Sequence, residues 1–192
     1  MKLAIATLKS ISPYSQSRYH DTPKKEKELP DDYELRTWRE RCHADDTGSL
    51  FIPPMTFKNC LQEAARFLSM KIKGQRNATW TKHFEAGVLV MDGLSLPEKK
   101  DTVPGESFFM NADGVPGSRT RVKRTYPVIR QWSGQVTFHI LDDLITEESF
   151  REHLETAGNL IGIGRFRPRN RGYYGRFKVE KIVWRDAAKS AA

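Results

Sequence analysis

The stretch "LIGIGRFRPRNRGYYGRF", residues 160–177, joins a predicted helix to a predicted final strand and contains no acidic residue. Glycines such as Gly162 and Gly164 allow the backbone to approach another group closely, because they carry no Cβ. A dinucleotide-binding loop would instead run from a strand into a helix, and the GK[ST] sequence of a P-loop is absent. Two interpretations remain: a nucleic-acid-binding loop, or a solvated basic loop after a helix end.

The side chains of this stretch favour contact with nucleic acid. Arginine can bind phosphate through paired hydrogen bonds, and aromatic rings can stack on bases. A helix C-cap would explain Gly162, but it would not explain five arginines with interleaved aromatic residues. The predicted contact residues here are Gly162, Gly164, Arg165, Arg167, Arg169, Arg171, Tyr173, Tyr174 and Arg176.

The surrounding sequence predicts an α+β protein. Strands follow from alternating or continuous apolar runs, and helices from apolar residues at helical spacing. Thr56 and Thr146 are the expected helix caps, and Gly74 the expected end of the first helix. The order strand, helix, strand, strand, helix, strand indicates a ferredoxin-like (RRM-like) split βαβ fold, with an antiparallel sheet and both helices on one face. In chain order, the predicted elements are residues 2–10, 55–70, 84–93, 134–141, 146–161 and 177–184.

The pattern also predicts a single domain over residues 1–186, followed by a disordered tail at 187–192. Two large insertions interrupt it, at about 11–53 and about 97–131. The second contains the turn sequences "NADG" and "VPGS" and is strongly basic, which indicates a projecting β-hairpin. Further nucleic-acid contacts are predicted in it at Arg119, Arg121, Lys123 and Arg124.

Composition narrows the class of partner. The 192 residues carry a formal net charge of +8, which favours a polyanionic binding partner. No apolar run approaches the roughly 18 residues of a membrane span, so no membrane partner is expected. Cys42 and Cys60 lack metal-ligand spacing, and we interpret both as reduced thiols of a cytoplasmic protein. The sequence predicts neither a metal site nor a cofactor.

Two motifs carry a resemblance to a known family. The stretch "GIGRFRPRNRGYYGRFKV" resembles the glycine-rich loop in backbone subunits of the RAMP superfamily of CRISPR-associated proteins. The stretch "FIPPMTFKNCLQEAAR" resembles the same family's helix entry, with Ile52, Pro53, Lys58 and Leu61 at corresponding positions. The chain also looks similar to short stand-alone proteins of phage and prophage origin.

The resemblance implies a ferredoxin-like fold, RNA binding in which Lys58 takes part, and an insertion at 97–131 equivalent to the thumb of backbone subunits. It also implies self-association into a helical filament along the strand, or assembly with other CRISPR-type subunits. The leading hypothesis is therefore a non-catalytic protein that binds RNA or single-stranded DNA, and the residues leave the choice between these two ligands open.

Two other functions stay open. A metal-independent endoribonuclease would need a general base, for which His20 is the best candidate, with Asp21 beside it. The other histidines are expected elsewhere: His83 at a strand edge, and His153 on the polar side of the second helix. The third hypothesis is a phage-encoded decoy that engages a host CRISPR complex through a backbone-like surface.

Overall fold

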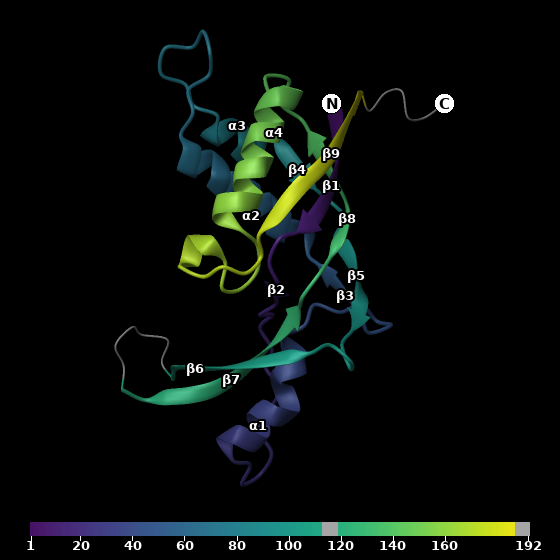
Figure 1. The fold of residues 1–192 in the computed structure, drawn as a ribbon, viewed down its shortest axis with the longest axis vertical. Coiled ribbons are helices and arrows are strands. Elements are labelled where there is room, and N and C mark those ends of the chain that lie inside the picture. Colours follow the sequence, from purple (N-terminus) through teal and green to yellow (C-terminus); the bar gives the residue numbers. More distant parts are fainter. Residues whose placement is uncertain (113–118, 187–192) are drawn as a thin grey trace.

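The computed structural model describes residues 1–112 and 119–186, and it is elongated along one axis (Figure 1). The described helices are α1 (Pro30–Thr37), α2 (Pro54–Leu68), α3 (Thr81–Ala86) and α4 (Glu147–Thr156). The strands are β1 (Lys2–Ser10), β2 (Tyr14–Ser15), β3 (Ser49–Ile52), β4 (Val88–Val90), β5 (Leu94–Lys99), β6 (Gly105–Asn111), β7 (Arg121–Ile129), β8 (Ser133–Ile140) and β9 (Phe177–Asp186). No helix within these two ranges has the length and apolar character needed to cross a bilayer.

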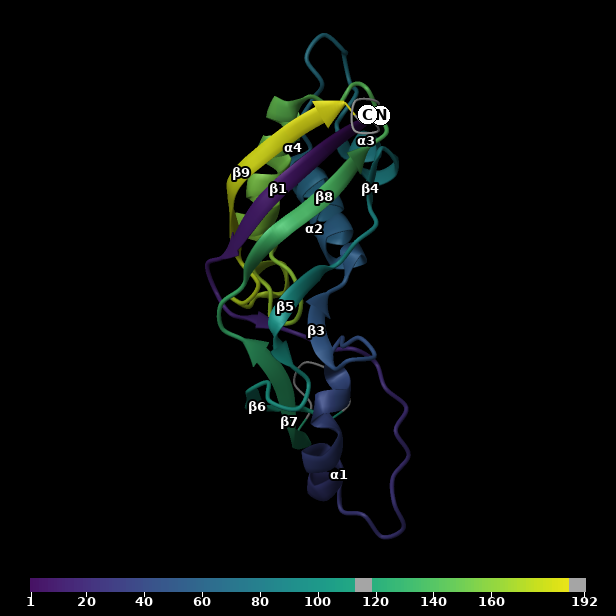
Figure 2. The ribbon, with the colours of Figure 1, turned by 90° about the vertical axis from the view of Figure 1, so that its right-hand side faces the viewer.

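The main sheet has the strand order β4-β8-β1-β9, and every pairing in it is antiparallel. Successive strand residues face opposite sides, so Ala4, Ala6 and Leu8 of β1 are all fully buried on one face. Helices α2 and α4 cover that face, and in Figure 2 they lie behind the sheet. The expected mixed α+β architecture with antiparallel strands is confirmed, as is the strand at residues 2–10.

The predicted strand over residues 84–93 is wrong in its first half. Residues 81–86 form α3 instead, and β4 is confined to Val88–Val90. Phe84 is fully buried on α3, and the Gly87 N–H donates to the carbonyl of His83 at 2.7 Å to close the helix end. A short apolar run fits a buried strand and a buried helical turn equally well, and the packing of Phe84 selected the helix.

The helix boundaries differ in detail from the sequence prediction. Helix α2 begins at Pro54 after Pro53, without a side-chain cap, so Thr56 does not cap it. Proline suits this position because its φ is preset and its missing N–H would have no helical partner. The helix ends at Ser69, in a left-handed conformation at φ 47°, and therefore well before Gly74. Thr146 caps α4 as predicted, accepting from the Ser149 N–H.

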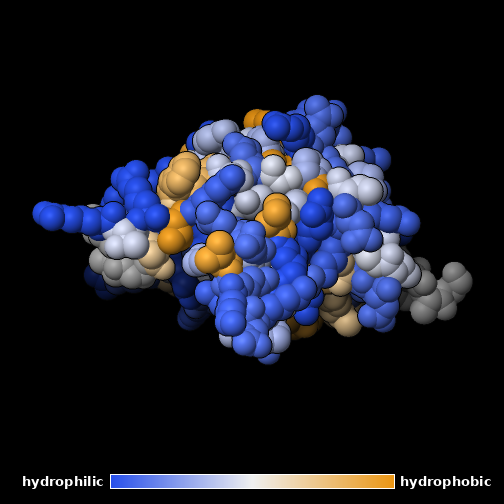
Figure 3. All heavy atoms as spheres, turned by 90° about the horizontal axis from the view of Figure 1, so that it is seen from below, coloured by the Kyte–Doolittle hydropathy of each residue, from blue (hydrophilic) through white to orange (hydrophobic). Residues whose placement is uncertain are grey.

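The predicted hairpin in the second insertion is formed by β6 and β7, which pair from Gly105 opposite Pro127 to Asn111 opposite Arg121. It belongs to a second sheet of order β2-β7-β6, while β3 pairs with β5. The hairpin projects below the glycine-rich stretch in Figure 1. From below, the surface is mostly hydrophilic, with isolated hydrophobic residues (Figure 3). The predicted tail at 187–192 lies outside the described residues.

Two histidines lie elsewhere than the sequence predicted. His153 is fully buried instead of lying on a polar helix face, because α3 covers that side of α4. Its ring stacks on Phe84 with a centroid separation of 4.2 Å, and its Nδ1 lies 2.7 Å from the Ser149 carbonyl oxygen. His83 lies on α3, with its Nδ1 2.6 Å from Oδ2 of Asp142, and not at a strand edge.

The buried His153 predicts a loss of stability in mild acid. Burial lowers the pKa of His153, so the folded state keeps the ring neutral while the unfolded chain binds a proton near its ordinary pKa of about 6.5. The free energy of unfolding should therefore fall as the pH drops below about 6.5 towards the folded-state pKa. Chemical denaturation at several pH values measures this slope. The slope should be shallower in His153→Phe, and an unaltered slope in that variant would contradict the assignment.

Candidate nucleic-acid interface

The glycine-rich loop, residues 162–176, folds back against the chain's own N-terminal segment. Gly162 and Gly164 have backbone φ angles of +75° and +72°, in a region that residues with a Cβ rarely adopt. A Cβ on Gly164 would collide with the Ser15 carbonyl oxygen and the Tyr14 ring. The next N–H, of Arg165, donates to that same Ser15 carbonyl at 2.9 Å. Gly164 therefore permits the close contact between the loop and β2, whereas a Cβ on Gly162 would collide with Pro168 inside the loop itself.

The loop also holds the base of the β6–β7 hairpin. Phe166 packs on Phe108 with ring centroids 4.5 Å apart, and the Tyr174 hydroxyl donates to Glu106 at 2.7 Å. Tyr174 is only 3% exposed, and its burial and its bond to Glu106 raise its pKa, which keeps the phenol protonated. Tyr174 thus packs within the protein, which leaves no ring face for a base to stack on.

Arg165 is a half-buried cation at the junction of loop and hairpin. Its guanidinium carbon lies 4.1 Å from the centroid of the Tyr126 ring, within cation–π range. It makes long contacts to Ser17 Oγ (3.4 Å) and Met110 Sδ (3.3 Å), and its Nε is buried without a partner. Burial lowers the pKa of Arg165, yet a guanidinium remains protonated in proteins. The side chain therefore holds a full charge and unused donor capacity.

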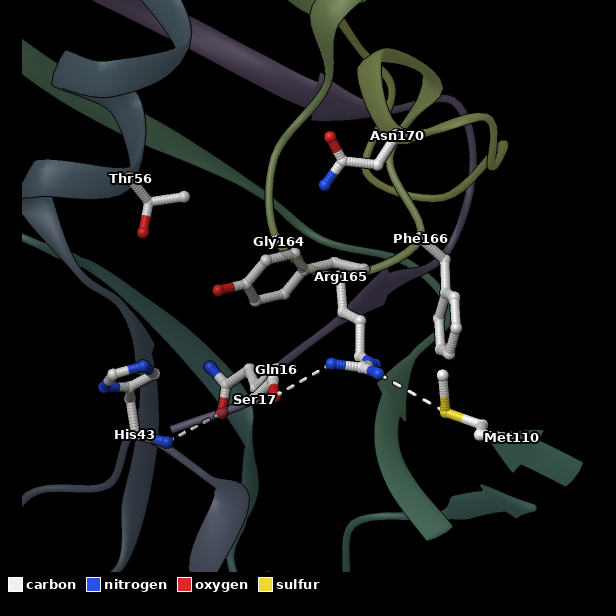
Figure 4. A pocket seen from close by; sticks show the side chains of 10 residues that line it. Gln16, Ser17, His43, Thr56, Met110, Gly164, Arg165, Phe166 and Asn170 are labelled. Atoms are coloured by element: carbon white, nitrogen blue, oxygen red, sulfur yellow. Dashed lines mark hydrogen bonds between the residues drawn. The ribbon is translucent and has the colours of Figure 1, made fainter. Parts of the chain in front are cut away.

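A cavity of about 470 Å³ opens beside Arg165. Figure 4 shows the guanidinium between Ser17 and Met110, with His43 and Thr56 on the opposite side. Burial, and then the charge of Arg18, lower the pKa of His43, which favours a neutral imidazole at pH 7. Among the described residues, no carboxylate lines the cavity. The lining residues are Tyr14, Gln16, Ser17, His43, Thr56, Met110, Gly164, Arg165, Phe166 and Asn170.

Sequence reasoning did not place Gln16, Ser17 or His43 at this site. They come from two segments far from the loop in sequence, and the Gln16 side chain joins those segments. Its Oε1 accepts from the His43 backbone N–H at 2.8 Å, and its Nε2 donates to the Phe51 carbonyl at 2.8 Å. No local motif marks this connection, so the sequence held no signal for it.

The outer part of the loop presents its charges to solvent. A short helical turn at Pro168–Asn170 and a left-handed Arg171 (φ 63°) reverse the chain there. Tyr173 is 64% exposed, so its ring is accessible. In the described parts of the chain, none of the exposed cations on the loop or the hairpin pairs with a carboxylate. These cations are Arg169, Arg171 and Arg176 on the loop, and Arg119, Arg121 and Lys123 on the hairpin.

Three of the predicted contact cations are bound by carbonyl or carboxylate oxygens of the protein. Lys58 is 7% exposed, and its ammonium donates to the carbonyl oxygens of Phe84 and Glu85 at 3.0 and 2.6 Å. Arg167 forms an ion pair with Glu63 at 2.7 Å. Arg124 forms one with Glu34 at 2.9 Å. Lys58 is therefore buried between α2 and α3, and its ammonium is not available to a ligand at the interface.

His20 and Asp21 do not line the cavity. The His20 ring stacks on Tyr33 of α1 with a centroid separation of 6.4 Å, and its Nδ1 lies 3.2 Å from the Thr22 hydroxyl. Asp21 is exposed. Over residues 1–112 and 119–186, no three His, Cys, Asp or Glu side chains gather as metal ligands.

Comparison with known proteins gives no family assignment. No protein-family model matches the chain, and no curated protein matches its sequence. Among solved structures, the chain is similar to Cmr6 from Pyrococcus furiosus, with 14% identity, a TM-score of 0.47, and coverage of 93% of this chain and 98% of that one. It is also similar to a chain of a CRISPR RNA-guided surveillance complex, with 11% identity and a TM-score of 0.33. That match covers 82% of this chain but only 58% of the other. Both TM-scores are low, and the function proposed below rests on this chain's own residues.

Proposed function

We propose that this protein binds single-stranded nucleic acid, with RNA as the preferred ligand, across the glycine-rich loop and the β6–β7 hairpin. The observation that carries the proposal is the cavity of about 470 Å³ beside Arg165, which no carboxylate of the described residues lines. Each terminal nitrogen of Arg165 has one N–H beyond its bond to Ser17 or Met110, and such a donor suits a phosphate oxygen. A polyanion would meet no repulsive charge within this cavity.

The exposed cations extend this site along the surface. Arg169, Arg171 and Arg176 would contact successive phosphates, and the Tyr173 ring would stack on a base. Hairpin cations such as Arg121 and Lys123 would contact the strand from the other side. Contacts of this kind bind the backbone and tolerate most sequences, so we expect little base specificity.

The fold and assembly form part of the same proposal. The strand order β4-β8-β1-β9, with two helices on one face, supports a ferredoxin-like single domain with residues 11–53 and 97–131 as insertions. Together with the two motif resemblances, it supports a RAMP-like protein that joins a CRISPR-type assembly or forms filaments on the strand. A heterologous contact between copies gives a filament instead of a ring where the rotation between neighbours does not close.

Salt dependence tests the binding directly. The three exposed loop arginines should contribute about −2 to the log–log slope of affinity against salt for a fluorescent single-stranded RNA, at roughly −0.7 per contact, and contacts by Arg165 and the hairpin cations should make the slope steeper. Fluorescence anisotropy at several salt concentrations measures this slope. Repeating the titration with DNA of the same sequence settles the ligand class. An affinity that does not change with salt would exclude the phosphate contacts.

Strand length separates the modes of assembly. Filament formation predicts that the number of proteins bound grows with strand length, as measured by light scattering on short and long RNAs. One protein per strand at every length would contradict the filament. Weak RNA binding combined with tight binding to a purified CRISPR complex would instead support the decoy.

The position of His43 favours metal-independent RNA cleavage as the second candidate. A neutral imidazole can accept the proton of a 2′-hydroxyl, and Arg165 across the same cavity can stabilise the negative charge that develops on the phosphorus oxygens. Cleavage of labelled RNA in the presence of EDTA, lost in His43→Ala and retained in His20→Ala, would establish this activity. If the RNA stays intact after long incubation, the cleavage activity is excluded and only the binding function remains.

A further inference from the structure

A second cavity lies at the end of β1 and shares no lining residue with the first. Its volume is about 660 Å³, within the range of roughly 300–1,000 Å³ found for small-molecule sites. The end of β1, the strand β5 and the connection from β7 to β8 form its walls, and Figure 2 shows β5 beside the lower part of β8. The lining residues are Lys9, Ser10, Ile11, Pro97, Arg130, Gln131, Trp132 and Ser133.

The charge in this cavity is of one sign. Lys9 and Arg130 are exposed and form no ion pair with any described residue, and no lining residue is acidic. On the neighbouring strand β9, Lys178 lies directly opposite Lys9, and Glu180 pairs with it at 3.1 Å and offsets its charge. Two cations converging on one hollow attract an anion, and phosphate is the anion that both side chains can hydrogen-bond.

The cavity wall also contains a polar group without a partner. Trp132 is only 3% exposed, and its indole Nε1 is buried with no hydrogen-bond partner among the described residues. Its ring packs between Phe57 and Phe177 in the core, with centroids at 6.3 and 6.0 Å. The indole therefore forms part of the wall behind the cavity, and its N–H signal reports on ligands that bind in front of it.

The remaining lining groups suit a ring with polar edges. Ile11 is 54% exposed and Pro97 is exposed beside it, so they offer two apolar surfaces to a flat ligand. The Gln131 amide and the Ser133 hydroxyl provide donors and acceptors for the edges of such a ring. The two cations, the polar side chains and the apolar surfaces thus occur in one cavity of suitable size.

We propose that this second cavity binds a nucleoside phosphate, with Lys9 and Arg130 on the phosphate and Ile11 and Pro97 against the base. The ligand is either a free mononucleotide or the phosphorylated end of a nucleic-acid strand. The inference does not depend on the function proposed for the glycine-rich loop, because no residue is shared between the two cavities.

Titration with AMP, followed by NMR of protein carrying ¹⁵N-labelled tryptophan, tests the proposal. Trp132→Phe identifies the Trp132 indole signal among those of the four tryptophans. AMP, or a short RNA with a 5′-phosphate, should shift this signal saturably. Saturation by AMP indicates a free nucleotide as the ligand, whereas a response to the phosphorylated RNA alone indicates a strand end.

Variants of the two cations test whether Lys9 and Arg130 bind the phosphate. Lys9→Ala and Arg130→Ala should each weaken binding about tenfold, the expected effect of one lost charge-assisted hydrogen bond. The matched control Lys73→Ala, which removes an exposed cation elsewhere, should bind normally. A variant lacking Arg169, Arg171 and Arg176 should retain the AMP shift, which separates this site from the loop. The proposal fails if neither ligand shifts the signal, if adenosine binds as tightly as AMP, or if the double variant of Lys9 and Arg130 binds normally.

Discussion

Replacing Arg169, Arg171 and Arg176 with alanine should weaken the binding of single-stranded RNA by on the order of 10³-fold, because each charge-assisted contact is worth about tenfold. The log–log salt slope should become less steep by about 2, since three phosphate contacts are lost at roughly 0.7 each. All three side chains are exposed and take part in no ion pair within the described chain, so the fold should tolerate the change. Fluorescence anisotropy in low and high salt measures both quantities.

A matched control separates local contact from net charge. Lys71, Lys73 and Arg76 are also exposed cations, and they lie between α2 and α3. Replacing these three with alanine lowers the net charge of the protein by the same amount. If both triple variants lose affinity equally, the loop is not the binding surface and only the overall charge of the protein attracts RNA.

Glu34→Ala should lower the free energy of unfolding by about 3–5 kcal/mol, the usual effect of removing one partner from a buried ion pair. The Glu34 carboxylate is only 5% exposed and accepts from Arg41 at 2.6 and 2.9 Å. It also accepts from Arg124 at 2.9 Å and from the Thr125 backbone N–H at 2.6 Å. Without Glu34, the Arg41 charge stays buried at the contact between α1 and the hairpin. Urea denaturation measures the change.

The dependence of the free energy of unfolding on pH in the acidic range provides a second test of the role of Glu34. Burial by itself raises the pKa of Glu34, but the hydrogen bonds from Arg41, Thr125 and Arg124 outweigh it and leave this pKa below its ordinary value. The stability supplied by the carboxylate is therefore complete above the unfolded pKa of about 4.3, and is lost as the pH falls through the folded pKa. Glu34→Ala should lack this loss. The control Glu26→Ala, at an exposed position, should change stability by no more than about 0.5 kcal/mol, and equal effects of both variants would contradict a buried ion pair.

The sequence alone determined the elements that bury one face against the core. Val136, Phe138 and Ile140 alternate along β8 and are all buried, as the period of two predicts. Leu61 lies on the buried face of α2, and Thr146 caps α4 where the helical pattern begins. These features depend on neighbours within a few residues, so the local pattern is sufficient to identify them.

Only the tertiary structure decided which polar and aromatic side chains are available to a ligand. Lys58 is held by carbonyl groups 26 and 27 residues away, and Tyr174 by a glutamate 68 residues away. His43 reaches the cavity because Gln16, 27 residues distant, ties its backbone in place. A basic or aromatic residue has the same local pattern whether it binds a ligand or a distant part of the chain, and long-range packing determines which of the two it contacts.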